Sequence, residues 1–338
     1  MLVVSLEFLA LGIVVAVAGV YLARAADQIS EITQLSRLLI GSVLLAAATS
    51  LPELTVDLSA IRQGMPNLAA GDLFGSSLMN LLILAVLDLV HRSGGKMLSR
   101  EAAAHALSAT SSITLTALSG VAILVAAHLP DCSFLGIGIW SWGILVAYLL
   151  GVRMIFLDQR VSVRAAVDAA EPDEISSRPV QLRLWTPAVT FAVAAIVLCF
   201  AGPRLAYTAG QLADLSGLGK TFVGTTLVAI TTSLPELVAS ITALRMKAFD
   251  LVIGNIFGSN AFNILLFFPL DAAYSGLLFQ DLSSSHAVTS LAVILATAVA
   301  TLGQLYRVER RWRVVEPDAL LMLLILIGSL FLVYRLPH

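Results

Sequence analysis

The hexapeptide TSLPEL stands at residues 49–54 and again at residues 232–237. Each copy lies inside a long apolar stretch, where a glutamate and a proline are both unfavourable. The same offset of 183 positions makes 18 of the 42 residues from 41 to 82 recur identically at 224–265. Chance similarity between apolar segments would supply leucines and alanines, but not this polar set at fixed spacing. The chain therefore carries an internal repeat.

The composition is typical of a membrane protein. Of the 338 residues, 58% are hydrophobic and 12% are charged, whereas an ordinary soluble domain has about 25% charged residues. Apolar stretches of about 20 residues, long enough to cross a bilayer as helices, recur along the chain. The net charge of −2 gives no reason to expect a nucleic-acid partner. The expected surroundings are a lipid bilayer, and the oligomeric state stays open.

Ten apolar segments predict ten transmembrane helices. They cover residues 2–22, 38–61, 67–90, 103–127, 133–157, 185–206, 221–244, 249–271, 286–305 and 317–335. The one long polar stretch, residues 158–183, is interpreted as a solvated cytoplasmic linker. The predicted organisation is a five-helix repeat over 1–157, a linker over 158–184 and a second five-helix repeat over 185–338.

The distribution of lysine and arginine predicts the orientation in the membrane. If ten spans alternate, 16 of the 20 basic residues fall on one side and 4 on the other. The richer side is expected to be cytoplasmic, which puts both termini outside a plasma (inner) membrane. Because each half has an odd number of spans, the two copies of the repeat cross in opposite directions. We therefore expect an all-α polytopic membrane protein with two inverted-topology repeats, as in many secondary transporters.

The glutamate of each hexapeptide is expected near the middle of the membrane. Glu53 and Glu236 each fall about 5 Å from the midpoint of their segments, at a rise of about 1.5 Å per residue. An acidic residue at this depth costs about 2.5–3.5 kcal/mol on insertion scales. A bound cation would offset that cost for both residues.

The neighbours of the glutamates are rich in oxygen. The threonine and serine that begin each hexapeptide share a helix face with its glutamate, and Pro52 and Pro235 each free a backbone carbonyl one turn earlier. A serine and an asparagine share one face of the following segment. Hard cations such as Ca²⁺ take six to eight oxygens, and the absence of Cys and His here argues against Zn²⁺ or Cu⁺. The side-chain oxygen donors are Thr49, Ser50, Glu53, Ser76, Asn80, Thr232, Ser233, Glu236, Ser259 and Asn263.

Taken singly, these residues also have structural explanations. A proline in a membrane helix is often only a kink, and Ser or Thr often bond their own backbone. A lone buried glutamate could be a protonated structural residue. The small residues Gly71, Gly75, Gly254 and Gly258 are expected to let backbones approach closely. The duplicated set, oppositely oriented and centred together, favours a cation site.

The motifs ATSLPEL…GDLFGSSLMN and TTSLPEL…GNIFGSNAFN resemble the paired α-repeats of prokaryotic-type Na⁺/Ca²⁺ exchangers, in the cation/Ca²⁺ antiporter superfamily. The strong match covers residues 41–82 and 224–265. The resemblance implies a four-position cluster of cation sites between the second, third, seventh and eighth helices. It gives ligand roles to the ten oxygen donors above, and to the backbone carbonyls of Ala46 and Ala229 for Na⁺. It also implies that the first and sixth helices slide as a gating pair.

The chain departs from the family pattern in both repeats. Asn263 stands where many relatives have an aspartate, which removes one carboxylate. Asp72 and Ser77 replace two asparagines, which the second repeat keeps as Asn255 and Asn260. The departures bear on stoichiometry and on any K⁺ requirement, which the sequence leaves open.

Asp57 lies one turn outward of the first glutamate, and its counterpart Ser240 carries no charge. We hypothesise that Asp57 and Asp72 form an acidic outer vestibule that draws cations inward. The alternative is that each simply hydrogen-bonds nearby backbone or hydroxyl groups. Asp88 and Asp271, which align at the same offset, are expected to be helix caps or interface residues, and Glu7 is expected to be solvated.

The sequence predicts a Na⁺-driven Ca²⁺ antiporter that works by alternating access. The transported ions are Ca²⁺ and Na⁺, and no cofactor is expected. Exchange of H⁺ for Ca²⁺ or another divalent cation is the alternative, because the same glutamates could carry protons. A cation channel fits less well, since an inverted repeat with central carboxylates is typical of a carrier. An enzyme is not expected, because the sequence has no nucleophile–base pair, phosphate-binding loop or metalloprotease motif.

Overall fold

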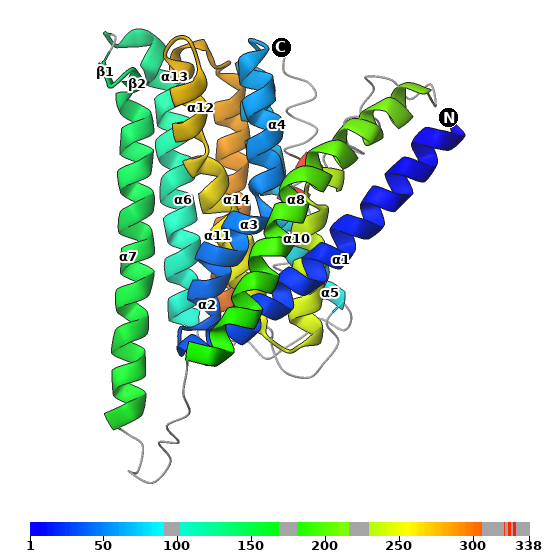
Figure 1. The fold of residues 1–338 in the computed structure, drawn as a ribbon. Helices are drawn as coiled ribbons and strands as arrows, with labels where there is room; N and C mark the ends of the chain where they lie inside the picture. Colours follow the sequence, from blue (N-terminus) through cyan, green and yellow to red (C-terminus); the bar gives the residue numbers. More distant parts are fainter. Residues whose placement is uncertain are drawn as a thin grey trace.

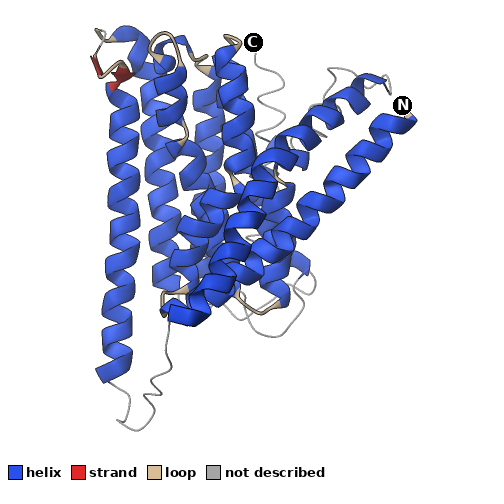
Figure 2. Cartoon of the chain, viewed as in Figure 1, coloured by secondary structure: helices blue, strands red, loops and turns tan. Residues whose placement is uncertain are grey.

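The structure, a computed structural model, describes residues 1–90, 102–130, 132–168, 181–215, 230–305, 321, 324, 325, 327 and 328. Within these residues it is helical apart from one two-stranded antiparallel hairpin (Figures 1 and 2). The elements of the first half are α1 (Leu2–Thr33), α2 (Arg37–Leu39), the π-helix η1 (Ile40–Leu45), α3 (Ala46–Thr49), α4 (Leu51–Arg62), α5 (Pro66–Val90), α6 (Ala102–Val125), the 3₁₀-helix η2 (Ala126–His128), β1 (Ser133–Phe134), β2 (Ile137–Gly138) and α7 (Ile139–Asp168). Those of the second half are α8 (Gln181–Leu215), α10 (Leu234–Arg245), α11 (Phe249–Leu265), α12 (Phe267–Ala273), α13 (Leu278–Asp281) and α14 (Ser285–Leu305).

Among the described residues, 7 helices are long and apolar enough to cross a membrane, and a bent pair makes an eighth candidate. The bent pair joins Arg37–Thr49 to Leu51–Arg62 at an angle of 43°. All eight candidates fall on predicted segments. Of the other two segments, 221–244 is described only from residue 230, and 317–335 lies almost entirely outside the described residues. The all-helical fold with several membrane spans is confirmed, and the count of ten stays a prediction.

The helices on either side of the predicted linker are longer than their apolar segments. α7 continues to Asp168 and α8 begins at Gln181, whereas the apolar segments end at 157 and begin at 185. Hydropathy marks where a helix leaves the apolar layer, but the backbone hydrogen bonds within a helix can continue into water. Residues 169–180 of the predicted linker lie outside the described part of the chain.

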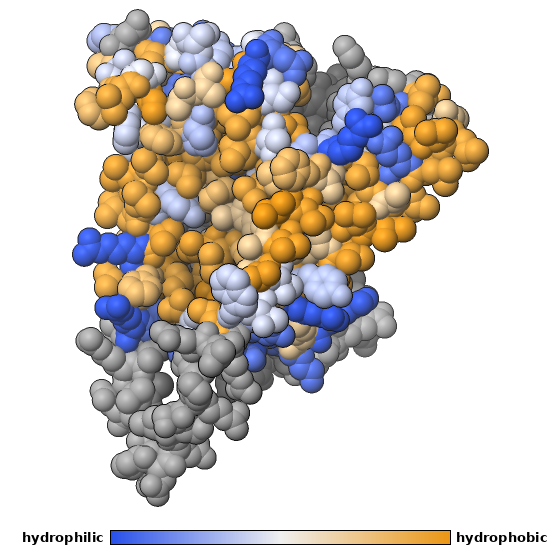
Figure 3. Space-filling model, in the orientation of Figure 1, coloured by the Kyte–Doolittle hydropathy of each residue, from blue (hydrophilic) through white to orange (hydrophobic). Residues whose placement is uncertain are grey.

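α1 and α8 lie side by side and are tilted across the other helices (Figure 1). Only 17% of the apolar window of each is buried, against 83% for the span Phe249–Ala273. Large apolar side chains such as Leu6 and Phe200 are exposed on them, and a broad apolar surface covers this side of the molecule (Figure 3). Glu7, expected to be solvated, is partly exposed and pairs with Arg204 at 2.7 Å, which joins the two helices. The pair therefore packs on the outside of the bundle, toward lipid.

α11 lies at the centre of the bundle and touches the first half backbone to backbone. A Cβ added at Gly254 would lie 2.6 Å from the carbonyl oxygen of Leu38, and one at Gly258 would collide with the backbone of Ser42. Glycine is therefore required where α11 crosses α2 and the π-helical turn η1. The predicted close approach at these two glycines is confirmed.

The close approach expected at the matching glycines of the first repeat, Gly71 and Gly75, involves residues outside the described part of the chain. Their expected neighbour is the counterpart of η1, residues 223–228, which lies outside the described residues. Among the described residues, only His286 comes within 4 Å of a Cβ built at Gly71, and nothing does at Gly75. The close approach at Gly71 and Gly75 stays a prediction.

The buried apolar residues form two clusters, and a polar layer separates them. On α5 the buried residues up to Phe74 belong to one cluster and those from Leu78 onward to the other. On α11 the change falls between Phe257 and Ala261. The positions in between carry glycine and buried serine or asparagine. The fold thus holds polar side chains in the middle of an otherwise apolar interior.

Candidate cation-binding site

Each TSLPEL copy interrupts its helix at the serine and starts a new helix at the leucine. Ser50 has φ −90° and ψ 9°, where α3 ends at Thr49 and α4 begins at Leu51. Ser233 has nearly the same angles, φ −84° and ψ 8°, before α10. The proline is the second residue of each new helix, where its missing N–H leaves no helical hydrogen bond unmade.

The interruption places each glutamate in the first turn of a helix. Glu53 and Glu236 are both 1% exposed. The N-terminus of a helix carries about half a unit of positive charge, which favours a carboxylate there. The prolines were expected to free backbone carbonyls, but since each helix already breaks at the serine before the proline, their observed effect is to begin a new helix whose N-terminus holds the glutamate. A proline followed by an acidic residue is itself a signal for a helix start and could have revealed it.

Two hydroxyl groups of the first repeat reach the carboxylates of both repeats. Ser76 donates to Oε1 of Glu53 at 3.5 Å, and Ser50 donates to Oε1 of Glu236 at 3.4 Å. Ser50 belongs to the first hexapeptide, so that hexapeptide contacts the glutamate of the second. These distances exceed the usual O–H···O range of about 2.5–3.0 Å. The oxygens are therefore held near one another without being tightly satisfied.

Further contacts join the two repeats in the same layer. Oγ1 of Thr49 lies 3.4 Å from Oδ1 of Asn255 and 3.3 Å from Oγ of Ser259. Nδ2 of Asn80 donates to Oδ1 of Asn260 at 3.0 Å. α3, α5 and α11 thus meet in one polar layer, and neither half of the chain forms it alone.

Several buried oxygens of this layer have no hydrogen-bond donor among the described residues. They are Oε2 of Glu53 and Glu236, both carboxylate oxygens of Asp57, Oδ2 of Asp72, the amide oxygens of Asn80 and Asn263, and Oγ of Ser233. An unsatisfied buried polar atom costs about 1–3 kcal/mol, and more when it is charged. A hard cation with six to eight oxygen ligands would satisfy several of them together. The donor set therefore fits ions such as Ca²⁺ and Na⁺.

Of the two backbone carbonyls named for Na⁺, that of Ala46 lies within the described residues. The carbonyl oxygen of Ala46 accepts the N–H of Ser50 at 3.1 Å and the hydroxyl of Thr49 at 3.2 Å. An ion at this carbonyl would have to share it with those donors. Ala229 lies outside the described residues. In the described part of the chain, no three His, Cys, Asp or Glu side chains are grouped to hold a metal, so neutral oxygens would supply most ligands.

Two glycines beside the site were not identified from the sequence. A Cβ at Gly202 of α8 would lie 2.6 Å from Cβ and Cγ of Pro52. One at Gly19 of α1 would lie 3.1 Å from Cγ1 of Val238 and 3.6 Å from the carbonyl oxygen of Pro235. The two glycines are counterparts at the 183-residue offset, as are the two prolines. Applying the offset to the first helix of each half would have found them.

Asp271 has a structural role away from the site. Its buried carboxylate accepts hydrogen bonds from the N–H of Gly138 at 2.8 Å, the hydroxyl of Ser141 at 2.6 Å and the N–H of Leu278 at 2.9 Å. It therefore joins α12 to β2, α7 and α13, which is the interface role expected for it.

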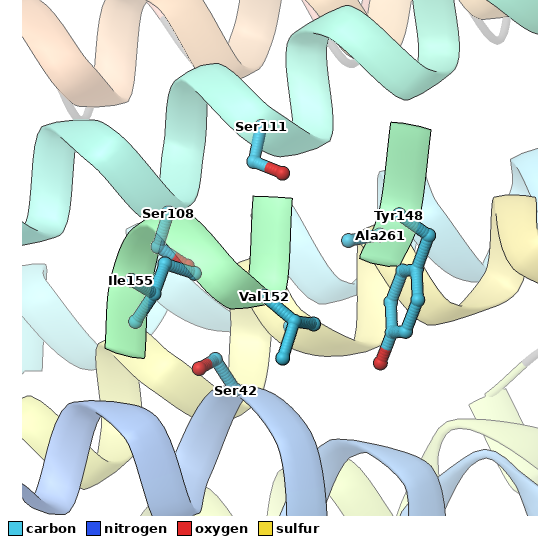
Figure 4. A pocket seen from close by; sticks show the side chains of 8 residues that line it. Ser42, Ser108, Ser111, Tyr148, Val152, Ile155 and Ala261 are labelled. Carbon is cyan, nitrogen blue, oxygen red and sulfur yellow. The ribbon is translucent and has the colours of Figure 1, made fainter. Parts of the chain in front are cut away.

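The small cavity in Figure 4 lies beside the site, between η1, α6, α7 and α11. Its volume is about 10 Å³, which is about enough for one water molecule. The hydroxyls of Ser42, Ser108 and Ser111 lie in its wall and would give that water polar partners. None of the predicted side-chain ligands lines it.

The comparison with known families decides which class of protein this is. The family model of the sodium/calcium exchanger protein matches residues 4–157 and 186–335. The chain belongs to this family. As a sodium/calcium exchanger family member it is a multi-pass membrane transporter, and the recognition made from the two motifs is confirmed.

Two curated proteins are similar to this exchanger-family chain over most of its length, and a third over a shorter stretch. Inner membrane protein YrbG of Escherichia coli K12 is 28% identical over 237 residues, which cover 70% of this chain and 69% of the relative. Putative antiporter CaxA of Alkalimonas amylolytica is 28% identical over 301 residues, covering 84% and 86%. Sodium/calcium exchanger MaX1 of Methanosarcina acetivorans is 36% identical, but over 104 residues that cover 29% of either chain.

Solved structures share the whole fold of this family member. The sodium-calcium exchanger NCX_Mj soaked with 100 mM Na⁺ and 10 mM Sr²⁺ superposes with a TM-score of 0.70 at 19% identity, covering 100% of both chains. The same exchanger soaked with zero Na⁺ and Ca²⁺ gives a TM-score of 0.68, covering 98% of this chain and 99% of the other. At this level of identity the likeness shows the fold.

Proposed function

We propose that this family member exchanges Na⁺ for Ca²⁺ across a plasma membrane by alternating access. The observation that carries the proposal is the pair Glu53 and Glu236, which are buried and come from opposite repeats. Each has one oxygen bonded by a serine and one oxygen without a donor among the described residues. Two carboxylates in a dry interior need positive charge nearby. Ca²⁺ and Na⁺, bound in turn, would supply it.

The proposed ligands surround these carboxylates in the polar layer between the two apolar clusters. The backbone carbonyls of Ala46 and Ala229 are added for Na⁺. The proposed side-chain ligands are Thr49, Ser50, Glu53, Ser76, Asn80, Thr232, Ser233, Glu236, Ser259 and Asn263. The burial and the contacts between repeats described above support this set.

The proposed architecture has ten spans in two inverted repeats, 1–157 and 185–338, with both termini outside. The gating motion is a sliding of α1 and α8 across the site. Their low burial and their glycine contacts against Pro52 and Pro235 support this role, since small residues allow helices to slide closely past each other. The empty site, with two negative charges, should resist crossing and so enforce exchange over leak.

Isotope flux in proteoliposomes tests the proposal. Ca²⁺ uptake should require an outwardly directed Na⁺ gradient, because the two ions compete for the same carboxylates. Glu53→Gln and Glu236→Gln should each abolish uptake, since each removes one of the two charges. Glu31→Gln is the control, because Glu31 is an exposed residue in a surface pair with Arg37. Na⁺-dependent uptake that survives in both glutamine variants would contradict the proposal.

Coupling to H⁺ is the alternative that the same vesicles separate. A pH gradient at zero Na⁺ is imposed in one experiment and a Na⁺ gradient at constant pH in the other. Uptake driven only by the pH gradient would assign the glutamates to proton exchange. Uptake that needs no counter-ion and does not saturate would instead indicate a channel.

A further inference from the structure

α4 and α5 are packed in a register that brings two acidic residues together. A short turn over residues 63–65 joins the helices, and Oγ of Ser76 lies 3.5 Å from Oε1 of Glu53. One helical turn further along both helices, about 6 Å along the axis, the register brings Asp57 opposite Asp72. This register therefore places the two carboxyl groups on facing positions of the helix pair.

The second repeat makes the same contact from neutral residues. The 183-residue offset makes Ser240 the counterpart of Asp57 and Asn255 the counterpart of Asp72. Nδ2 of Asn255 donates to Oγ of Ser240 at 3.2 Å. The molecule therefore contains two versions of one contact, of which one is a satisfied hydrogen bond and the other is a pair of carboxyl groups.

The acidic version is unsatisfied when both groups are ionised. Asp57 is 1% exposed, and neither of its carboxylate oxygens has a donor among the described residues. Oδ2 of Asp72 is buried and has none either. A hydrogen bond between the two groups needs a proton, which two carboxylates do not carry. Two adjacent buried negative charges are costly without a positive partner, so the pair points to a bound positive ion.

We propose that Asp57 and Asp72 bind a hard divalent cation of the Ca²⁺ class, at a site additional to the one around Glu53 and Glu236. Two carboxylates match the charge of such an ion and can provide up to four of its six to eight oxygens. Asp72 is half-buried, which leaves access for water ligands. The choice of ion rests on the proposed function, because the pair lies one turn from the proposed transport site.

The second repeat supplies the variant that tests this site. Asp57→Ser with Asp72→Asn reproduces the Ser240–Asn255 contact in the first repeat. It removes both carboxylates and puts in their place a hydrogen-bonded pair that the fold already contains. The thermal unfolding midpoint in detergent verifies that the variant folds. The matched control is Glu31→Gln, which removes an exposed carboxylate of the same half.

Equilibrium binding of radioactive Ca²⁺ to the full chain, in detergent and without Na⁺, is the measurement. The variant Glu53→Gln with Glu236→Gln should keep one Ca²⁺ per chain. Adding Asp57→Ser and Asp72→Asn to it should remove that ion, whereas adding Glu31→Gln should not. Equal binding with and without the two aspartates overturns the proposal. The proposal is also overturned if the double variant Glu53→Gln, Glu236→Gln folds but binds no Ca²⁺.

Infrared spectroscopy separates a metal ion from a proton shared by the two carboxyl groups. Ca²⁺ should shift the carboxylate bands of the Glu53→Gln, Glu236→Gln variant, and the shift should be lost with the two aspartates. A protonated-carboxyl band of the pair that persists at saturating Ca²⁺ overturns the proposal. Failure of the proposed function looks different. Ca²⁺ uptake that ignores Na⁺ would refute the exchange reaction and leave the count of bound Ca²⁺ unchanged.

Discussion

Asp271 accepts two backbone N–H groups and one serine hydroxyl inside the fold. Because all three partners are donors, a carboxylate satisfies them and an amide does not. Asp271→Asn replaces an acceptor oxygen by an NH₂ group that faces a donor. We expect the variant to lose about 1–3 kcal/mol of unfolding free energy, measured as a lower thermal midpoint in detergent.

A carboxylate on the surface gives the comparison for this change. The side chain of Glu31 is 63% exposed and pairs with Arg37 at 3.1 Å. Exposed pairs of this kind contribute about 0–1 kcal/mol, so Glu31→Gln should leave the midpoint nearly unchanged. An Asp271→Asn variant as stable as Glu31→Gln would show that the interface role is wrong.

At the scale of residues, the sequence predicts kinds of side chain better than their partners. Hydroxyl, amide and carboxylate groups at repeated spacing predicted an oxygen-rich layer, and the described members of the set are buried there. The partners of Thr49, which are Asn255 and Ser259, could not be derived. They depend on how the two halves dock, and docking is decided by many packing contacts distant in sequence.

At the scale of elements, the contact of α8 with the first helix interruption makes a sharp prediction. A Cβ at Gly202 would lie 2.6 Å from the rigid ring of Pro52. Gly202→Ala should therefore push α8 away from α4, at a cost of about 1–3 kcal/mol. We expect Ca²⁺ uptake in proteoliposomes to fall strongly, because the displaced helix belongs to the proposed gating pair.

Other glycines on α1 and α8 supply controls of graded severity. At Gly19 the nearest atom would be the terminal Cγ1 of Val238 at 3.1 Å, which can move, so Gly19→Ala should be milder. Nothing described lies within 4 Å of a Cβ at Gly210 of α8 or Gly12 of α1. Alanine there should preserve or raise stability, since it favours a helix over glycine by about 0.5–1 kcal/mol. Equal Ca²⁺ uptake by Gly202→Ala and Gly210→Ala would show that the contact of Gly202 with Pro52 does not limit transport.

The apolar segments predicted where helices lie along the chain, but they did not predict where each helix ends. α7 and α8 extend beyond the apolar segments because polar residues continue a helix in water. The π-helical turn η1 was not predicted, since nothing in Ile40–Leu45 except a glycine marks it. It lies where the glycines of α11 allow the two backbones to meet.

At the scale of the whole molecule, cysteine chemistry can test the proposed orientation. The chain has two cysteines, of which Cys132 is exposed between η2 and β1 and Cys199 lies half-buried in α8. β1 and the N-terminus lie at the same end of the molecule (Figure 1). In a Cys199→Ser variant, a membrane-impermeant maleimide added to intact cells should label Cys132. Labelling only after the cells are opened would reverse the orientation.

Repeat, composition and charge predicted a polytopic helical membrane protein, and the fold and family agree. The sequence could also pair α1 with α8 as counterparts, but it could not show that they pack together at a tilt outside the bundle. That arrangement depends on long-range packing between helices that are far apart in the sequence, which the sequence of either helix alone does not determine.

The hydrogen bond from Ser50 to Glu236 has a consequence for the ancestry of the chain. A half-length ancestor with a single TSLPEL copy would have held the glutamate without the serine that reaches it from the other copy. If the two repeats are inverted as proposed, such an ancestor could form this contact only as two identical subunits inserted in opposite directions. In the single chain the two copies are present one to one and can differ, as they do at Asp57 and Ser240.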